Sequence, residues 1–341
     1  MKMLSIYGRY CTFMGMAVLL LAACRKDLCY DHEKHALSVK TDVAADWEQE
    51  WERTYRVDWK NNWKEEWSRE YDELRPSKAT GIRALVYQTD GRYVENNLNA
   101  DGGRLPMEEG IQALLFYNND TEYIVFGDLS SSVSASVTTR TLTRGNFQSL
   151  HANERTVNQP DQLYGSYIEE YEAQRTLESV SLPVTLRPLT YTYMIRFEFS
   201  AGLKYVALAR GALAGMAESV YLQDGHTGAK TATVMFDCTL EDFGVEALVK
   251  TFGVPNYPGD HYTRVDGENR YTLNLEVRLS NGKIKNFEFD VTDQVASQPR
   301  GGVLIVNDVE ISDEEGQEGS GAFDPTVEGW GDYIDIPLPI I

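Results

Sequence analysis

The feature that most constrains the fold of this chain is an alternation of apolar and polar side chains within short stretches. In residues 191–199 and 271–279, every second side chain is aromatic or aliphatic, which is the period of a half-buried β-strand. The second stretch runs into Asn281-Gly282, a dipeptide favoured in two-residue hairpin turns because both central positions need a positive φ. A returning strand is therefore predicted over 284–291.

The same pattern predicts further strands along most of the chain. Many short strands separated by turn residues indicate an all-β protein built from antiparallel sandwiches. Two segments are predicted to depart from this pattern: His151 to Glu178 as a long polar loop with a short helix, and Asp242 to Phe252 as a short helix. The further strands are predicted at residues 82–87, 112–117, 122–126, 131–139, 180–186, 203–208, 218–222, 231–239 and 303–311.

The N-terminus is organised as a secretory signal. A short basic region with Lys2 and Arg9 precedes an uncharged apolar run from Cys11 to Leu21, which is too short to be a spanning helix. Leu21-Ala22-Ala23-Cys24 resembles the bacterial lipobox, in which the cysteine thiol is diacylated and the chain is cut before it. We therefore expect residues 1–23 to be a signal peptide and Cys24 to carry a membrane-anchoring lipid.

The remaining chain of about 318 residues is long for one core and suggests two domains. Residues 24–36 are predicted to be a polar tether. Leu186-Arg187-Pro188 separates two runs of strands, so we expect one β-domain over 37–186 and a second over 187–341.

Charge and cysteine content narrow the class of protein. The formal net charge is −20, and it becomes −22 without Lys2 and Arg9. Such an acidic chain repels nucleic acid, which argues against DNA or RNA as a partner. After processing, Cys29 and Cys238 would be the remaining thiols; a disulfide between them stays open, although Cys238 fits better as a small apolar residue on a strand.

An unusual run of aromatic residues occupies positions 47–71. One falls at every fourth position, with charged residues in most of the spaces: Trp47, Trp51, Tyr55, Trp59, Trp63, Trp67 and Tyr71. A spacing of four is close to one helical turn, so an aromatic-rich helix is predicted over about 46–74. Such a stripe is interpreted in two ways: as a helix packed on the sandwich, which we favour, or as a surface that binds a partner or a glycan.

Other candidate sites carry less specific signals. Residues 97–108 approach a calcium-loop pattern, but Arg104 and Pro106 fit better in a Gly-rich connection between strands. His32 and His35 lie in the expected tether without a convincing ligand set, and no metal or cofactor is predicted. Neither a nucleophile motif nor a phosphate-binding loop is found, so no catalytic residues are predicted and the chain is not expected to be an enzyme.

The C-terminal residues alternate in a different way. Ile334, Ile336, Leu338 and Ile340 are interleaved with Asp335, Pro337 and Pro339. Proline cannot donate to a sheet ladder, so such a strand pairs fully on one side only. These residues are therefore candidates for an edge strand or for a strand exchanged with another molecule.

Four segments resemble a known group of proteins. They are residues 24–32, residues 209–220 with Gly215-Met216-Ala217 after a strand, residues 289–302, and Gly321-Ala322-Phe323 followed by Val327-Glu328-Gly329-Trp330. Together they resemble Bacteroidales lipoproteins of the fimbrillin superfamily. The resemblance implies two tandem transthyretin-like β-sandwiches. The aromatic run at 47–71 has no evident counterpart in this pattern.

The resemblance also implies a function. Lipoproteins of this group serve as anchor or accessory subunits of outer-membrane (type V) fimbriae and contact other subunits through exchanged strands. We therefore expect a lipid-anchored outer-membrane protein, at the cell surface, that works by protein–protein contact. The alternative is a surface glycan-binding lipoprotein that uses Trp47, Trp51, Trp59, Trp63 and Trp67 as stacking platforms.

Overall fold

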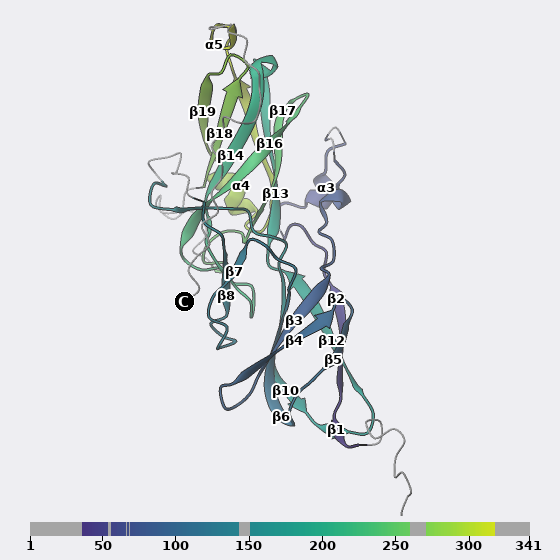
Figure 1. The fold of residues 1–341 in the computed structure, drawn as a ribbon. Coiled ribbons are helices and arrows are strands. Elements are labelled where there is room, and N and C mark those ends of the chain that lie inside the picture. The colour runs from purple at the N-terminus through teal and green to yellow at the C-terminus, as the bar shows by residue number, and fades with distance from the viewer. Residues whose placement is uncertain are drawn as a thin grey trace, which may run out of the picture.

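The computed structural model describes residues 36–317, apart from 54–55, 66, 68, 143–150 and 260–270. Within these ranges the chain is dominated by β-strands, which confirms the all-β prediction (Figure 1). Its few helices are short, and none of those described has the length and apolarity to cross a membrane.

Strands from the first part of the chain close into a barrel, at the lower end of Figure 1. The order around it is β10-β12-β2-β5-β4-β3-β6. Neighbours are antiparallel except β12 and β2, which run parallel. The strands are β2 (Thr41–Trp47), β3 (Gly81–Tyr87), β4 (Tyr93–Asn99), β5 (Gly102–Leu105), β6 (Gly110–Asn118), β10 (Tyr164–Ala173) and β12 (Val180–Pro188).

The later strands form a large sheet at the other end of the molecule (Figure 1). Its order is β19-β18-β14-β16-β17-β13-β20, and β9 (Arg155–Val157) adds to it by pairing with β16. The strands are β13 (Tyr191–Ala201), β14 (Val206–Ala217), β16 (Thr231–Glu241), β17 (Gly244–Thr251), β18 (Thr272–Leu279), β19 (Ile284–Asp290) and β20 (Gly302–Glu310).

Small elements connect and flank these two bodies. β1 (Ser38–Val39) pairs with β11 (Arg175–Thr176), and β15 (Val220–Tyr221), β8 (Ser136–Thr139) and β7 (Ile124–Phe126) form a three-stranded sheet. The helical segments are α3 (Trp59–Asn62), η1 (Tyr71–Leu74), η2 (Leu203–Tyr205), α4 (Thr292–Ser297) and α5 (Asp313–Gln317).

The barrel and the large sheet have separate hydrophobic cores, which are filled by alternate side chains of their strands. In β13, Tyr193, Ile195 and Phe197 are fully buried in the core of the large sheet, whereas Ile82, Leu114 and Phe116 fill the barrel. A third cluster joins the two bodies, because it contains Leu115 and Tyr117 from the outer face of β6, residues of β7, β8 and β15, and Ala217 at the end of β14.

Two local predictions are wrong. Residues 244–251 form strand β17, not a helix, because they pair residue by residue with β13 from Tyr191↔Thr251 to Glu198↔Gly244. The stretch from His151 to Glu178 is not mainly loop, since it contains β9, β10 and β11. In both cases a partner strand supplies the hydrogen bonds and buried surface that local sequence does not reveal.

The continuous helix predicted over about 46–74 is also wrong. Among the described residues of this range, helical structure is limited to α3 and η1, while Trp47 ends strand β2. The physical reason is that the aromatic side chains are buried on two different bodies. Trp47 belongs to the barrel core, and Trp51 and Trp67 pack on the large sheet. One straight helix could not serve both.

The loop with calcium-like spacing is a tight hairpin turn. Asn99 in β4 pairs with Gly102 in β5, so Ala100 and Asp101 make the turn. A Cβ at Gly102, whose φ is +100°, would lie 2.1 Å from the Val43 carbonyl oxygen, which explains the glycine. The predicted Gly-rich connection is therefore present but shorter than residues 97–108, because 97–99 and 102–105 belong to β4 and β5. The described residues contain no cluster of metal-ligating side chains there or elsewhere.

Candidate functional site

The predicted site residues fall into three groups. Cys24 and the strand-exchange candidates Ile334, Ile336, Leu338 and Ile340 lie outside the described residues, as do Cys29 and Tyr55. Cys238 lies on β16, partly buried against the core of the large sheet. The five tryptophans are all described, and they define the candidate site.

Trp47 is separate from the other four. It packs edge-on against Tyr164 of the barrel with ring centroids 4.9 Å apart, and its indole Nε1–H donates to the Ala100 carbonyl at 2.9 Å. Trp47 therefore closes the end of the barrel as a core residue.

The other aromatic residues form one cluster on the outer face of the large sheet. Trp51 and Trp67 are buried, and Trp59, Trp63 and Tyr71 are partly buried beside them. Their rings pack edge-to-face, with centroid distances of 5.9 Å for Trp51–Trp63 and 4.7 Å for Trp63–Trp67. The sheet residues beneath this aromatic cluster are Met194, Leu248, Val303 and Ile305.

Two indole N–H groups of the aromatic cluster donate to the protein, whereas the buried Nε1 of Trp51 has no hydrogen-bond partner among the described residues. The indole N–H of Trp59 donates to Gln298 Oε1 at 2.8 Å, and that of Trp63 donates to the Arg69 carbonyl at 2.7 Å. Rings that pack edge-to-face or tilted against one another, and that lie on a sheet, do not offer a row of open faces to sugar rings. The arrangement therefore favours the packed interpretation over a row of glycan-stacking platforms.

A buried ion pair lies under the aromatic cluster. Arg196 of β13 bonds to Glu246 of β17 at 2.9 Å, and both are almost fully buried. Arg69, from residues 47–71 (the aromatic segment), bonds to the other oxygen of Glu246 at 2.8 Å. The Arg196 guanidinium also lies 3.7 Å from the centre of the Phe243 ring. Such a pair needs several hydrogen bonds to offset its desolvation. The aromatic segment supplies one of them through Arg69.

Sequence reasoning missed this pair, although one signal was present. Met194 and Arg196 occupy the face of β13 opposite Tyr193, Ile195 and Phe197. A methionine on the nominally polar face indicates that something covers it. The charge on Arg196 gave no sign of burial, because arginine is usually exposed.

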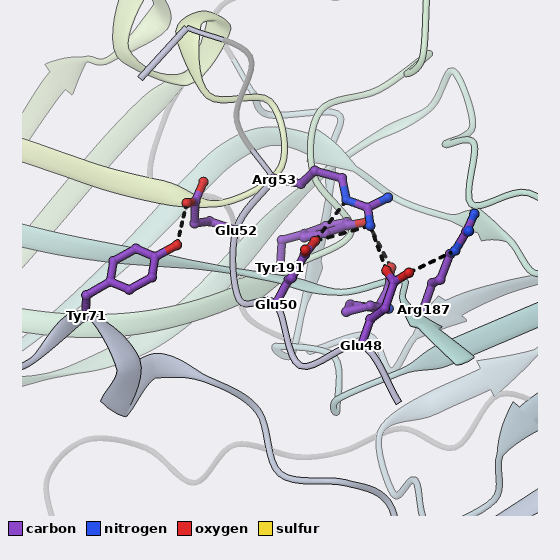
Figure 2. A network of polar contacts seen from close by, with 8 residues as sticks. Glu48, Glu50, Glu52, Arg53, Tyr71, Arg187 and Tyr191 are labelled. Carbon is purple, nitrogen blue, oxygen red and sulfur yellow. Dashed lines mark hydrogen bonds and ion pairs between the residues drawn. The ribbon is translucent and has the colours of Figure 1, made fainter. Parts of the chain in front are cut away.

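A second polar network lies where the aromatic segment leaves the barrel, and Figure 2 shows it from close by. Arg53 bonds to Glu48 at 2.8 Å and to Glu50 at 3.2 Å. Arg187 of β12 bonds to the other oxygen of Glu48 at 3.2 Å. These contacts fasten the extended residues 48–53 to the barrel, beside a cavity of about 740 Å³ that Glu48, Trp51, Lys60 and Arg75 also line.

Glu52 is the titratable group of this network with the strongest shift toward neutral pH. Burial raises its pKa to about 6, although the hydrogen bond from the Tyr71 hydroxyl at 2.8 Å favours the ionised form. The same burial raises the pKa of Tyr71, so its hydroxyl stays a donor. The hydrogen bond between Glu52 and Tyr71 thus links two parts of the aromatic segment in a pH-sensitive way (Figure 2).

Comparison with known proteins places this architecture in a family. The model of the family described as "Domain of unknown function (DUF5119)" matches residues 66–237, half of the chain. The chain belongs to the DUF5119 family. In this DUF5119 protein, the match covers most of the barrel and the large sheet as far as β16.

Two relatives extend the comparison over about four-fifths of the DUF5119 protein. A protein of Bacteroides ovatus, provisionally named fimbrium anchoring subunit Fim4B, is 23% identical over 299 residues, which is 79% of this chain and 88% of the relative. A solved structure of a provisionally named adhesin from Bacteroides ovatus matches with a TM-score of 0.53 and 19% identity, over 83% of this chain and 97% of that one. The sequence resemblance to fimbrial proteins of this bacterial group is thereby confirmed, and the shared fold spans both bodies.

Proposed function

We propose that this DUF5119 protein is an accessory subunit of surface fimbriae, held at the outer membrane by a lipid on Cys24 and acting through contacts with other subunits. The observation that carries the proposal is the alignment with a fimbrium anchoring relative over most of both chains. An elongated all-β molecule with its anchor at one end suits a role in assembly or adhesion.

The position of the first described strand supports the anchoring part of the proposal. β1 lies at the end of the barrel remote from the large sheet (Figure 1). A tether from Cys24 to Ala36 spans at most about 43 Å when fully extended. The lipid would therefore keep this end of the barrel near the membrane and direct the large sheet away from it.

Exposed apolar side chains gather at the same end. Ser38 of β1 pairs with Thr176 of β11, so Leu37 and Leu177 flank that pair on one side; they are 64% and 58% exposed. Val180, at the start of β12, is 43% exposed. Apolar side chains beside a lipidated tether would gain by resting in the membrane interface.

The large sheet has two edge strands, β19 and β20, at which strand-mediated contact can be considered. β20 is hydrogen bonded to β13 on one side, and glutamine side chains occupy part of its other side. β19 pairs with β18, and no other described strand lies on its free edge. A strand such as 334–340 of a neighbouring subunit is proposed to pair with the free edge of β19.

The anchoring proposal is tested with Cys24→Ala in the native bacterium. We expect the variant to move from the membrane fraction to the soluble fraction, whereas Cys238→Ala, which keeps the lipid site, should remain bound. Membrane retention of the Cys24 variant equal to that of the wild type would contradict lipid anchoring.

The assembly proposal is tested by purifying the wild-type protein from its outer membrane and identifying what accompanies it. We expect fimbrial subunits in the purified material and their loss when residues 333–341 are deleted. Recovery of the same partners by a folded truncated protein would exclude the C-terminal strand as the contact. Recovery of polysaccharide without fimbrial subunits would contradict the assembly role.

A further inference from the structure

A second cavity lies at the junction of the two bodies. β10 and β12 pair only at Tyr164↔Pro188 and Gly165↔Arg187 and then diverge. The space beside them, about 290 Å³, is also lined by the loop from Leu222 to Gly225. Three arginines from separate parts of the chain line it: Arg53, Arg187 and Arg300. This is a concentration of positive charge in a chain with a net charge of −20.

Two of these arginines are held opposite each other by the backbone. Arg53 and Arg300 form an isolated antiparallel bridge, in which the Arg53 N–H donates to the Arg300 carbonyl at 2.6 Å. Residues directly opposite in such a bridge project their side chains to the same face. Like charges in this position repel, so the arrangement requires compensating negative charge.

The negative charge that compensates these arginines is distributed unevenly among them. Arg53 and Arg187 share Glu48, and Arg53 also bonds to Glu50. Arg300 is only 7% exposed, and none of the described carboxylates forms an ion pair with it. Its Nη2 donates to the Gly225 carbonyl at 2.6 Å, and its Nε has no hydrogen-bond partner among the described residues.

Aromatic rings stabilise Arg300 in part. Its guanidinium lies 5.3 Å from the centre of the Tyr191 ring and 4.6 Å from that of Tyr257, which is cation–π range. Asp224 is the acidic residue that lines the cavity. It is already engaged by His226, through the backbone N–H at 3.0 Å and the ring Nδ1 at 2.6 Å. A buried guanidinium without a paired anion is unfavourable, so the cavity favours an incoming negative group.

We propose that this cavity binds a small oxyanion, a carboxylate or phosphate group, with Arg300 as its principal ligand and Arg187 at its rim. Guanidinium groups bind both chemistries through paired N–H donors. A volume of about 290 Å³ is at the small end of ligand cavities. The proposed site stands apart from the fimbrial role and from the lipid anchor.

The test measures binding to the full-length protein purified in detergent. Sodium phosphate and sodium succinate are titrated separately by calorimetry, with sodium chloride of equal ionic strength as the reference, and the midpoint of thermal unfolding is followed in parallel. We expect saturable binding of at least one probe and a midpoint that rises with its concentration. The two probes show whether phosphate or carboxylate is preferred.

Variants assign the site. Arg300→Gln should weaken binding by roughly tenfold or more, because a charge-assisted contact is lost, whereas Arg92→Gln, at an exposed arginine remote from the cavity, should bind like the wild type. If Arg300→Gln fails to fold, Arg187→Gln decides, since that side chain is 64% exposed; we expect it to bind a few-fold more weakly. No binding beyond the chloride reference, or unchanged binding in the folded cavity variant, would overturn the proposal.

Discussion

The side-chain amide of Gln298 bonds to both backbone polar groups of Val303: its Oε1 accepts from the Val303 N–H at 2.9 Å and its Nε2 donates to the carbonyl at 2.7 Å. Gln294 does the same for Ile305, at 2.9 Å for each bond. Four residues of helix rise about 6 Å, which is close to the rise of two residues of strand. Helix α4 and Gln298, the residue that follows it, thus present two amides in register with the edge of β20.

This relationship predicts that Gln298→Ala destabilises the protein. The variant leaves two buried backbone groups and the Trp59 indole N–H without partners, and each unsatisfied group costs roughly 1–3 kcal/mol. Urea unfolding should show a lower midpoint with an unchanged slope. Gln298→Glu is the informative comparison, because a carboxylate still accepts from the N–H groups but cannot donate to the Val303 carbonyl. An alanine variant as stable as wild type would contradict edge capping.

The buried Arg196–Glu246 pair predicts a strongly asymmetric response. Glu246→Gln removes the counter-charge of Arg196 and should cost about 3–5 kcal/mol. Replacing both residues by Met and Leu should recover much of that loss, because no charge remains buried. Chemical denaturation of the wild type, of Glu246→Gln and of the double variant Arg196→Met, Glu246→Leu measures this. Asp90→Asn, in the exposed pair with Arg92, is the control and should change stability by less than about 0.5 kcal/mol.

The raised pKa of Glu52 predicts a pH-dependent contribution to stability. Its folded-state pKa of about 6 lies above the ordinary 4.5. The contribution is therefore full below about pH 4.5 and is lost as pH rises through 6. Relative to Glu52→Gln, the wild type should lose up to about 1 kcal/mol between pH 4.5 and 7.5, after allowance for partial exposure of the carboxyl. Denaturation curves at both pH values check this; a constant difference between the two proteins would contradict it.

The aromatic cluster predicts a loss of stability rather than of binding alone. Trp51 is 2% exposed, so Trp51→Ala should cost about 3–5 kcal/mol through lost burial and the resulting cavity. Calorimetric unfolding measures the effect, and Trp59→Ala, at a partly buried position, should cost less. The glycan-platform interpretation makes the opposite prediction: unchanged stability in both variants, with loss of polysaccharide binding on an affinity gel.

The sequence by itself determined the all-β class and many of the strands, because period-2 alternation reports which face of a strand is buried. It placed β13, β18 and β19 with the Asn281-Gly282 turn between the last two. It also predicted a Gly-rich connection between strands within residues 97–108, where Gly102 has a positive φ; that the connection is a two-residue turn at 100–101 is seen only in the structure. These are local properties, because side-chain period and turn conformation depend on residues that are neighbours in the sequence.

Only the tertiary structure decided how the aromatic segment and the charged residues are used. The spacing of four between Trp47 and Tyr71 indicated a helix, yet the side chains divide between the barrel and the large sheet because burial on two surfaces outweighs a marginal helix. Arg196, Glu246 and Arg300 read as surface residues in the sequence. Their burial depends on segments more than 40 residues away along the chain, and no local pattern records such contacts.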